Sequence, residues 1–131
     1  SFGTGNYDLV LVKYISSGVQ QWNFTWGGID NEAGSGVVVD SSDNIYITGF
    51  TDSFGVGFKD MVLVKYDSSG AQKYYSTWGG NNWNQGTGIA ADSSDNIYIA
   101  GYTSNSTLGG NDIVLVKYGE VQEAENGIPV I

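Results

Sequence analysis

Residues 60–99 read DMVLVKYDSSGAQKYYSTWGGNNWNQGTGIAADSSDNIYI, and the first seven of them recur twice elsewhere in the chain. Nearly the same heptapeptide stands at residues 8–14 as DLVLVKY and at residues 112–118 as DIVLVKY, so successive copies start 52 residues apart. The WGG and DSSDN segments each occur twice with the same spacing. A strict repeat of this length indicates an array of like structural units, and it decides the fold before any single segment does.

The composition favours short strands joined by tight turns. The 131 residues include 20 Gly, one Pro, nine Tyr and four Trp, and 40% of them are hydrophobic, which is enough for a buried core. A net charge of −9 disfavours binding to nucleic acid or to an anionic membrane surface. No apolar run approaches the roughly 18 residues that span a bilayer, so no membrane insertion is expected in this segment. With no Cys and no His, the usual zinc ligands are missing, and we expect neither a metal nor a cofactor.

Each full unit contains four segments with strand character. A Gly-flanked, β-branched run (34–40) and the run NIYITGF (44–50) come first, followed by an almost continuously apolar run (60–66) and a polar, aromatic one (71–78). This pattern predicts an all-β fold of β-propeller blades, each with four antiparallel strands, named A to D from the axis outwards. The chain then reads C-D, A-B-C-D and A-B-C, about two and a quarter blades of a 52-residue repeat.

The repeat also predicts how the chain is divided. A propeller segment over 1–118 comprises a partial blade (1–33), a full blade (34–85) and a final partial blade (86–118), and residues 119–131 form a tail or linker. Because strand D is missing from the last blade, we expect it to come from chain upstream, as in propellers that close their ring with a borrowed strand. The alternative is that 131 residues are the whole molecule and that exposed blade edges pair between chains.

A family resemblance supports this interpretation, and it covers nearly everything up to Tyr118. It is carried by Asp60, Leu63 to Tyr66, Gly70, Trp78 to Gly80 and Asp92 to Ile99. These positions resemble the bacterial and archaeal seven-bladed β-propeller repeat family, whose pattern runs approximately D-x-x-L-V-K-Y, then G, W, W-G-G and V-x-V-D-S-x-G-N-I-Y-V-x-G. One turn Gly of that pattern is Asp43 in one copy and Asp95 in the other, and Asp tolerates such a turn. The resemblance implies an exported or cell-surface propeller, often embedded in a larger protein, and no particular activity.

The carboxylates of the DSSDN segments could suggest a Ca²⁺ loop. Asp40, Asp43 and Asn44, with their equivalents one repeat later, lack the alternating ligands and the distal Glu of an EF-hand loop. An Asx-type hairpin turn, repeated because the blade is repeated, explains them better. The acidic pair Asp30 and Glu32 becomes Asn82 and Asn84 in the next copy, so a structural metal in every blade is not expected.

Periodic lysines and tryptophans are also best explained by the scaffold. Lys13, Lys65 and Lys117 could form a cationic ring for an anionic ligand, but we expect strand-end lysines whose amines pair with acids of a neighbouring blade. Trp26 and Trp78 could stack on sugar rings, but their strict spacing favours packing between blades.

The residues outside the repeat are better candidates for a ligand site. Trp83 has Asn31 as its counterpart, so the scaffold does not require an indole there. It lies in NNWNQG, a loop rich in amides, and with Asn82 and Tyr102 it forms our candidate site for a glycan or a partner protein. A Trp that folds back on its own blade is the alternative.

Two N-glycosylation sequons occur, at Asn23 and Asn105. Neither is reproduced in the neighbouring copies, and both fall on segments that we expect to be accessible.

These observations favour a non-catalytic, extracellular or cell-surface module of a structural, adhesive or sheath-like protein. Its expected partners are neighbouring blades of the same or another chain, together with a protein or glycan ligand. The alternatives are a carbohydrate-binding, lectin-like propeller and a subunit that assembles by strand pairing between chains. An enzyme is disfavoured because the segment has no His, Cys or Arg and because its acids lie mostly in repeated turns. A lyase or hydrolase site would have to lie in missing blades.

Overall fold

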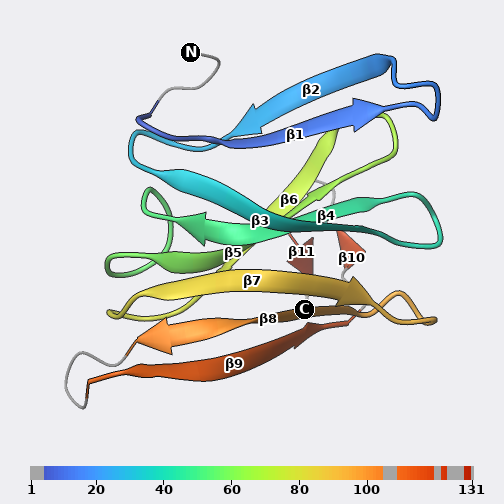
Figure 1. The fold of residues 1–131 in the computed structure, drawn as a ribbon. Helices are drawn as coiled ribbons and strands as arrows, with labels where there is room; N and C mark the ends of the chain where they lie inside the picture. The colour runs from blue at the N-terminus through green and yellow to red at the C-terminus, as the bar shows by residue number, and fades with distance from the viewer. Residues whose placement is uncertain (1–4, 105–108, 120–121, 124–128, 131) are drawn as a thin grey trace.

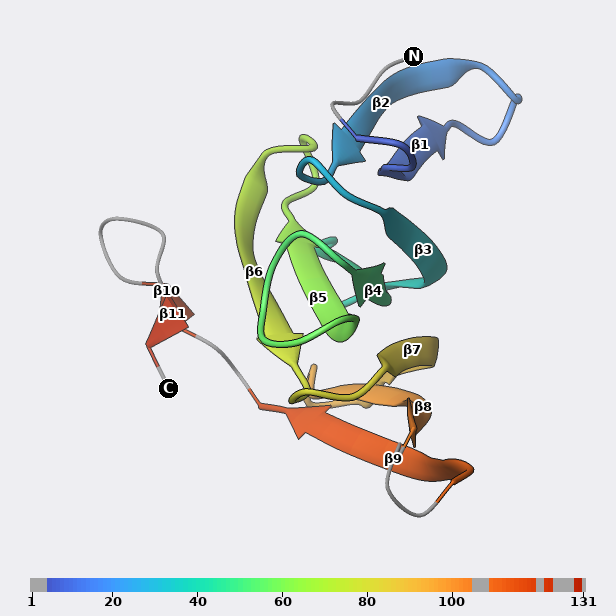
Figure 2. The same cartoon turned by 90° about the vertical axis from the view of Figure 1, so that its left-hand side faces the viewer.

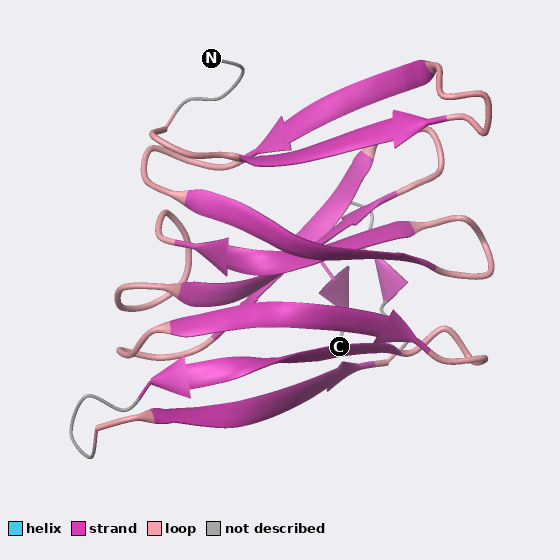
Figure 3. Ribbon diagram, viewed as in Figure 1, coloured by secondary structure: helices cyan, strands magenta, loops and turns pink. Residues whose placement is uncertain are grey.

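The computed structural model describes residues 5–104 and 109–119 and the backbone of 122–123 and 129–130, and these parts contain strands and loops but no helix (Figure 3). No helix that could span a membrane is found there. The strands follow the chain as β1 (Leu9–Tyr14), β2 (Gln20–Trp26), β3 (Glu32–Val39), β4 (Ile45–Thr51), β5 (Asp60–Tyr66), β6 (Gln72–Trp78), β7 (Asn84–Ala91), β8 (Ile97–Ser104), β9 (Asn111–Tyr118), β10 (Gln122–Glu123) and β11 (Pro129–Val130).

The strands form separate antiparallel sheets, stacked side by side in Figure 1. The central sheet has the order β3-β4-β5-β6, the sheet after it has β7-β8-β9, and the sheet before it has β1-β2. This is the predicted sequence of C-D, A-B-C-D and A-B-C strands, so the all-β fold of partial propeller blades is confirmed. We call the three sheets blade 1 (β1-β2), blade 2 (β3 to β6) and blade 3 (β7 to β9). The predicted tail at 119–131 lies mostly outside the described residues, apart from Gly119 and the short β10-β11 pair.

The blades share one register. Ile45 pairs with Tyr66 in blade 2, and Ile97 pairs with Tyr118 in blade 3, one repeat later. The first strand of each also carries the same irregularity, between Gly34 and Gly36 in β3 and between Gly86 and Gly88 in β7. The strict spacing of the sequence therefore reappears as a strict equivalence of backbone positions.

Two hydrophobic clusters fill the joints between blades. At the first joint, Leu9 and Leu11 of β1 meet residues of β4 and β5, and at the second, Met61 and Leu63 of β5 meet Ile97 and other residues of blade 3. Strand C therefore directs alternate side chains to the preceding and the following blade, as a pleated strand between two sheets requires.

The WGG tryptophans belong to these joints, as the sequence predicts. Trp26 is buried, and its ring centroid lies 5.2 Å from that of Phe54 and 5.3 Å from that of Tyr75, both in blade 2. Trp78 packs against the second cluster. Packing between blades therefore accounts for both indoles.

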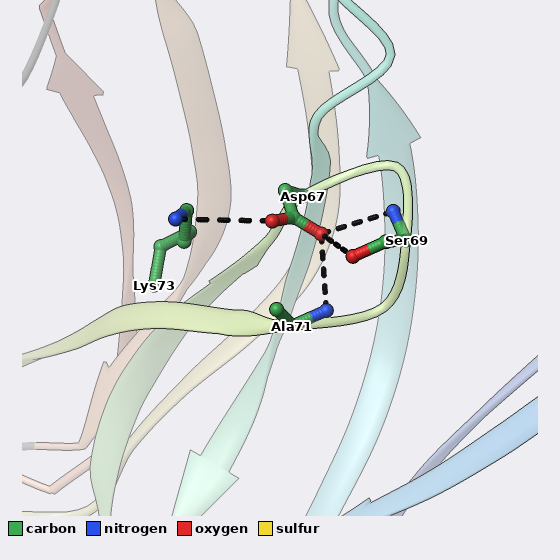
Figure 4. A network of polar contacts seen from close by, with 4 residues as sticks. All are labelled: Asp67, Ser69, Ala71 and Lys73. Carbon is green, nitrogen blue, oxygen red and sulfur yellow. Dashed lines mark hydrogen bonds and ion pairs between the residues drawn. The ribbon is translucent and has the colours of Figure 1, made fainter.

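The turn between β5 and β6 is closed by one carboxylate (Figure 4). Asp67 Oδ1 accepts hydrogen bonds from the Ser69 backbone N–H at 2.9 Å, the Ser69 hydroxyl at 2.6 Å and the Ala71 N–H at 3.0 Å. Gly70 takes a φ of 88°, which suits a residue without a Cβ. Asp67 Oδ2 also lies 3.8 Å from Lys73 Nζ. The sequence DSSG therefore fixes this turn locally, before any packing between blades.

Candidate functional site

Two sets of loops meet at one end of the blades, which lies on the left in Figure 1 and faces the viewer in Figure 2. We call it the loop end. It comprises the D-to-A corners at 27–31 and 79–83 and the B-to-C loop at 52–59. Residues here change between copies: Trp83 replaces Asn31, and Phe58 stands where the previous copy has Asn6. Because the repeat does not require these side chains, the loop end is the candidate site.

Backbone hydrogen bonds hold each corner in place. The Asn84 N–H donates to the Lys59 carbonyl at 2.8 Å, and the Ser104 N–H donates to the Trp83 carbonyl at 2.8 Å. One repeat earlier, the N–H groups of Glu32 and Asp52 make the same bonds to the carbonyls of Tyr7 and Asn31. Since only the backbone is used, position 83 can carry an Asn or a Trp without changing the corner.

Beneath the first corner lies a buried carboxylate. Glu32 Oε2 accepts the Gly28 N–H at 2.9 Å, and Oε1 accepts the Thr51 hydroxyl at 2.8 Å and the Ser53 N–H at 3.1 Å. Burial raises the pKa of Glu32, but the hydrogen bonds from Ser53, Gly28 and Thr51 outweigh it, so the pKa lies below its usual value. The ionised carboxylate of Glu32 therefore stabilises the corner at 27–31.

The second corner uses an amide in the same place. Asn84 Nδ2 donates to the carbonyls of Lys59 at 3.2 Å and Asn82 at 3.0 Å. The neighbouring Asp60 is buried, which raises its pKa more than hydrogen bonds from Val56 and Asn84 lower it. The two corners thus share a backbone geometry, but the first has the carboxylate of Glu32 where the second has the neutral amide of Asn84.

The Trp83 side chain has a partner that sequence reasoning missed. Lys59 Nζ lies 3.7 Å from the Phe50 ring centroid and 5.1 Å from the Trp83 ring centroid. Cation–π attraction to both rings holds the ammonium group between them. Trp83 is still 53% exposed, so half of its surface remains available to a ligand.

Trp83 and Phe58 together line two shallow cavities. One, of about 390 Å³, is also lined by Asp30, Asn31 and Asp52. The other, of about 260 Å³, is lined by Asn81, Asn82 and Ser104 in addition. Phe58 is 72% exposed. The site therefore consists of two aromatic side chains within a rim of carboxylates and amides.

The structure brings together part of the predicted site. Asn82 stands beside Trp83 at the wall of the smaller cavity. Tyr102 does not line either cavity, and its hydroxyl donates to Gln85 Oε1 at 3.1 Å across β7 and β8. Phe58 and Lys59 were missed, although both differ from their counterparts in other copies, which is the signal that identified Trp83.

Of the two sequon residues, Asn23 is exposed on β2. Asn105 lies outside the described residues.

The DSSDN turns lie at the opposite end and are satisfied internally. Asp92 Oδ1 accepts the N–H groups of Ser94 and Asn96, and Oδ2 accepts the Asn96 amide and the Tyr98 hydroxyl. Led by the Asn96 side chain, these bonds lower the pKa of Asp92 to about 2. Asp40 makes the equivalent bonds one repeat earlier. The predicted Asx-type turn is therefore present in both copies.

Each periodic lysine lies near an aromatic ring of its own blade. Lys65 Nζ lies 5.6 Å from the ring centroids of both Tyr46 and Tyr74, and Lys117 Nζ lies 5.5 Å from that of Tyr98. Lys13 lies over Trp22 in the same way. The partners seen for these amines are thus aromatic rings of adjacent strands within the same blade, because the register places a Tyr or Trp opposite each Lys.

No three of the described acidic side chains gather as ligands of a metal ion would. Side chains at the loop end can stack on a ligand, form hydrogen bonds with it and interact with its charge. These interactions suit a surface that binds a ligand.

Comparison with known proteins agrees with the fold. The family model described as SBBP: Beta-propeller repeat matches residues 76–109, from the end of β6 through β7 and β8. Over this segment the chain is similar to a propeller repeat, which suggests a module that interacts with other proteins. The search of curated proteins found no match.

Proposed function

We propose that the chain is a non-catalytic interaction module and that the loop end is its contact surface. The observation that carries this proposal is the pair Phe58 and Trp83, two largely exposed aromatic side chains that share two cavities at positions the repeat leaves free. Aromatic residues in such a setting dominate the energy of many interfaces, and the amide and carboxylate rim supplies orientation.

The setting that we propose is extracellular, in a surface, adhesive or sheath-like protein. The acidic composition, the exposed sequon at Asn23 and the resemblance described above support this location. The same resemblance supports seven blades for the full ring.

A carbohydrate ligand is the second candidate. The half-exposed indole of Trp83 stands beside Asn81 and Asn82, whose amides could bond to hydroxyl groups while the ring stacks on a sugar.

The test uses the chain itself, a Phe58→Ala/Trp83→Ala double variant and a Val19→Ala control. Val19 is an exposed apolar residue at the opposite end, next to the β1-β2 turn. Each protein is immobilised and exposed to the extracellular protein fraction of the source organism, and each is also applied to a glycan array. We expect specific protein capture, or specific glycan spots, that the double variant loses and the control keeps. Binding that is unchanged in the double variant would refute the loop end as the contact surface.

A further inference from the structure

The two cavities at the loop end differ in charge. The larger one, of about 390 Å³, is lined by two carboxylates, those of Asp30 and Asp52. The smaller one is lined by Asn82 and Ser104, which stand one repeat later at the equivalent positions. We call them the acidic cavity and the neutral cavity. The same two aromatic side chains line both, so the carboxylates are what distinguishes the ligands that the two cavities suit.

The carboxylates of the acidic cavity are held in place by the backbone. The Asp30 N–H donates to the Ser53 hydroxyl at 3.0 Å, and the Asp52 N–H donates to the Asn31 carbonyl at 2.8 Å. Asn31 Nδ2 also donates to Asp52 Oδ2, at 3.4 Å. No described lysine forms an ion pair with Asp30 or Asp52. Both charges are therefore positioned without a cation of the described chain to neutralise them.

The aromatic wall of the acidic cavity attracts cations. Lys59 Nζ lies 3.7 Å from the Phe50 ring centroid and 5.1 Å from that of Trp83, so it is held chiefly by Phe50. Lys59 is the only cationic residue among those that line the cavity, where two carboxylates offset it. Trp83 is 53% exposed and Phe58 is 72% exposed, which leaves aromatic surface for a second cation.

We propose that the acidic cavity binds an arginine side chain of a partner protein. The inference rests on the function proposed above and names the chemistry that the loop end recognises. A guanidinium group is planar, so it can stack on the exposed surface of Trp83 while its N–H groups pair with the carboxylates of Asp30 and Asp52. The ammonium group of lysine is a compact and more strongly hydrated charge, which suits this combination less well.

Composition and charge also favour such a partner. These 131 residues contain five lysines and no arginine, so a second copy of them cannot supply the side chain. Their net charge of −9 attracts a basic partner and steers it to the surface. Arginine and aromatic residues are enriched where protein interfaces gain most of their binding energy. A basic segment with an exposed arginine therefore fits the acidic cavity in both charge and shape.

The probe is a blocked five-residue peptide with one arginine between glycines, titrated into the isotope-labelled chain and followed by NMR. Matched peptides carry lysine or citrulline instead, and citrulline keeps the shape of arginine but has no charge. We expect saturable shifts of the Trp83 indole N–H with the arginine peptide. Binding should be about threefold weaker with lysine and about tenfold weaker or less with citrulline. Raising the NaCl concentration from about 0.05 to about 0.5 M should weaken the binding of arginine.

Variants of the chain locate the site. Asp30→Asn/Asp52→Ser gives the acidic cavity the residues of the neutral one, which the same corner geometry already accommodates. It should weaken arginine binding by about tenfold or more. Asp43→Asn/Asp67→Asn is the matched control, because it removes the same number of carboxylates from turns at the opposite end. The control should leave arginine binding unchanged.

Competition connects the cavity to a partner protein. In the capture experiment described above, the arginine peptide should displace the captured proteins and the citrulline peptide should not. If Phe58→Ala/Trp83→Ala loses proteins that the arginine peptide does not displace, the loop end remains the contact surface and the arginine preference is wrong. The inference is also overturned if citrulline binds as well as arginine, or if Asp30→Asn/Asp52→Ser binds the arginine peptide as tightly as the unmodified chain does.

Discussion

Leu63 and Leu115 occupy the same position of the repeat, in β5 and β9, yet Leu63 is fully buried and Leu115 is 68% exposed. Each leucine stands between two valines. β5 and β9 also pair with strand B of their own blades in the same register. The difference lies in what covers them, because blade 3 packs on β5 and no described residue packs in that way on β9. In a repeat protein, the neighbouring unit decides which periodic residues carry the stability.

Truncation of these two leucines should give the largest difference in stability between two equivalent positions of the repeat. Leu63→Ala should lower the free energy of unfolding by about 2 to 5 kcal/mol, because it leaves a cavity in the second joint. Leu115→Ala should change it by less than about 0.5 kcal/mol, as expected of an exposed position. Urea denaturation of both variants measures the difference. Similar losses would show that a further unit covers β9 in solution.

The two corners offer a second comparison, between Glu32 and Asp60. At neutral pH, Glu32→Gln should lower the free energy of unfolding by about 1.5 to 3 kcal/mol, since a charged acceptor of buried hydrogen bonds is lost. Asp60→Asn should have an effect below about 1 kcal/mol, because ionisation of this buried carboxyl is already unfavourable in the fold.

Their pH dependence should have opposite signs. The pKa of Glu32 is lowered from 4.5, so its stabilisation is present above pH 4.5 and is lost as the pH falls through the lower folded pKa. The pKa of Asp60 is raised from 3.8, so stability declines as the pH rises from 3.8 through the higher folded pKa. Thermal denaturation between pH 2 and 7 should show a shallower loss on acidification in Glu32→Gln and a steeper one in Asp60→Asn. Parallel curves for both variants and the wild type would contradict this assignment.

The left-handed turn residues form a third pair. Asp43 and Asp95 have φ values of 63° and 62°, where Gly is favoured. Asp95 also accepts hydrogen bonds from the Ser41 N–H and hydroxyl of blade 2, whereas no residue that the structure describes donates to the Asp43 carboxylate in this way. Asp43→Gly should raise the free energy of unfolding by about 0.5 kcal/mol, and Asp95→Gly should lower it by about 1 kcal/mol. Equal changes on thermal denaturation would show that the Ser41 contact contributes nothing.

The smallest expected difference separates Lys65 from Lys117. Lys65 lies over two tyrosine rings and Lys117 over one, because blade 3 as described has no strand D beside β9. Replacement by Met keeps the stem and removes the charge. We expect a loss of about 1 kcal/mol for Lys65→Met and about 0.5 kcal/mol or less for Lys117→Met by chemical denaturation. A larger loss at Lys117 would mean that its described ring partner is not the dominant one.

The sequence was sufficient to predict the blades, the order of their strands and the role of Trp26 and Trp78. These follow from the alternation and spacing of apolar residues, which the backbone geometry of a pleated strand enforces. The turn chemistry around Asp40 and Asp92 was also predictable, because an Asx turn depends on residues close in sequence.

Partners across strands and blades were harder to predict. The sequence alone does not show that the register sets tyrosines on both sides of Lys65. Trp83 was singled out because the repeat does not require it, but its neighbours Lys59 and Phe58 come from a loop whose path depends on two glycines with positive φ, Gly55 and Gly57. Such a loop brings together residues that no periodic pattern connects.

The bonds between blades imply that the two joints differ in mechanical stiffness. The second joint is bridged by hydrogen bonds at both ends, from Asn84 to Lys59 at the loop end and from Ser41 to Asp95 at the opposite end, where the DSSDN turns lie. The first joint has the loop-end hydrogen bond, from Glu32 to Tyr7, and a cavity of about 470 Å³ lies between Trp22 of blade 1 and Val39 of blade 2. Among the described residues, we therefore expect blade 1 to rotate about the corner at 27–31 more readily than blade 3 rotates about the corner at 79–83.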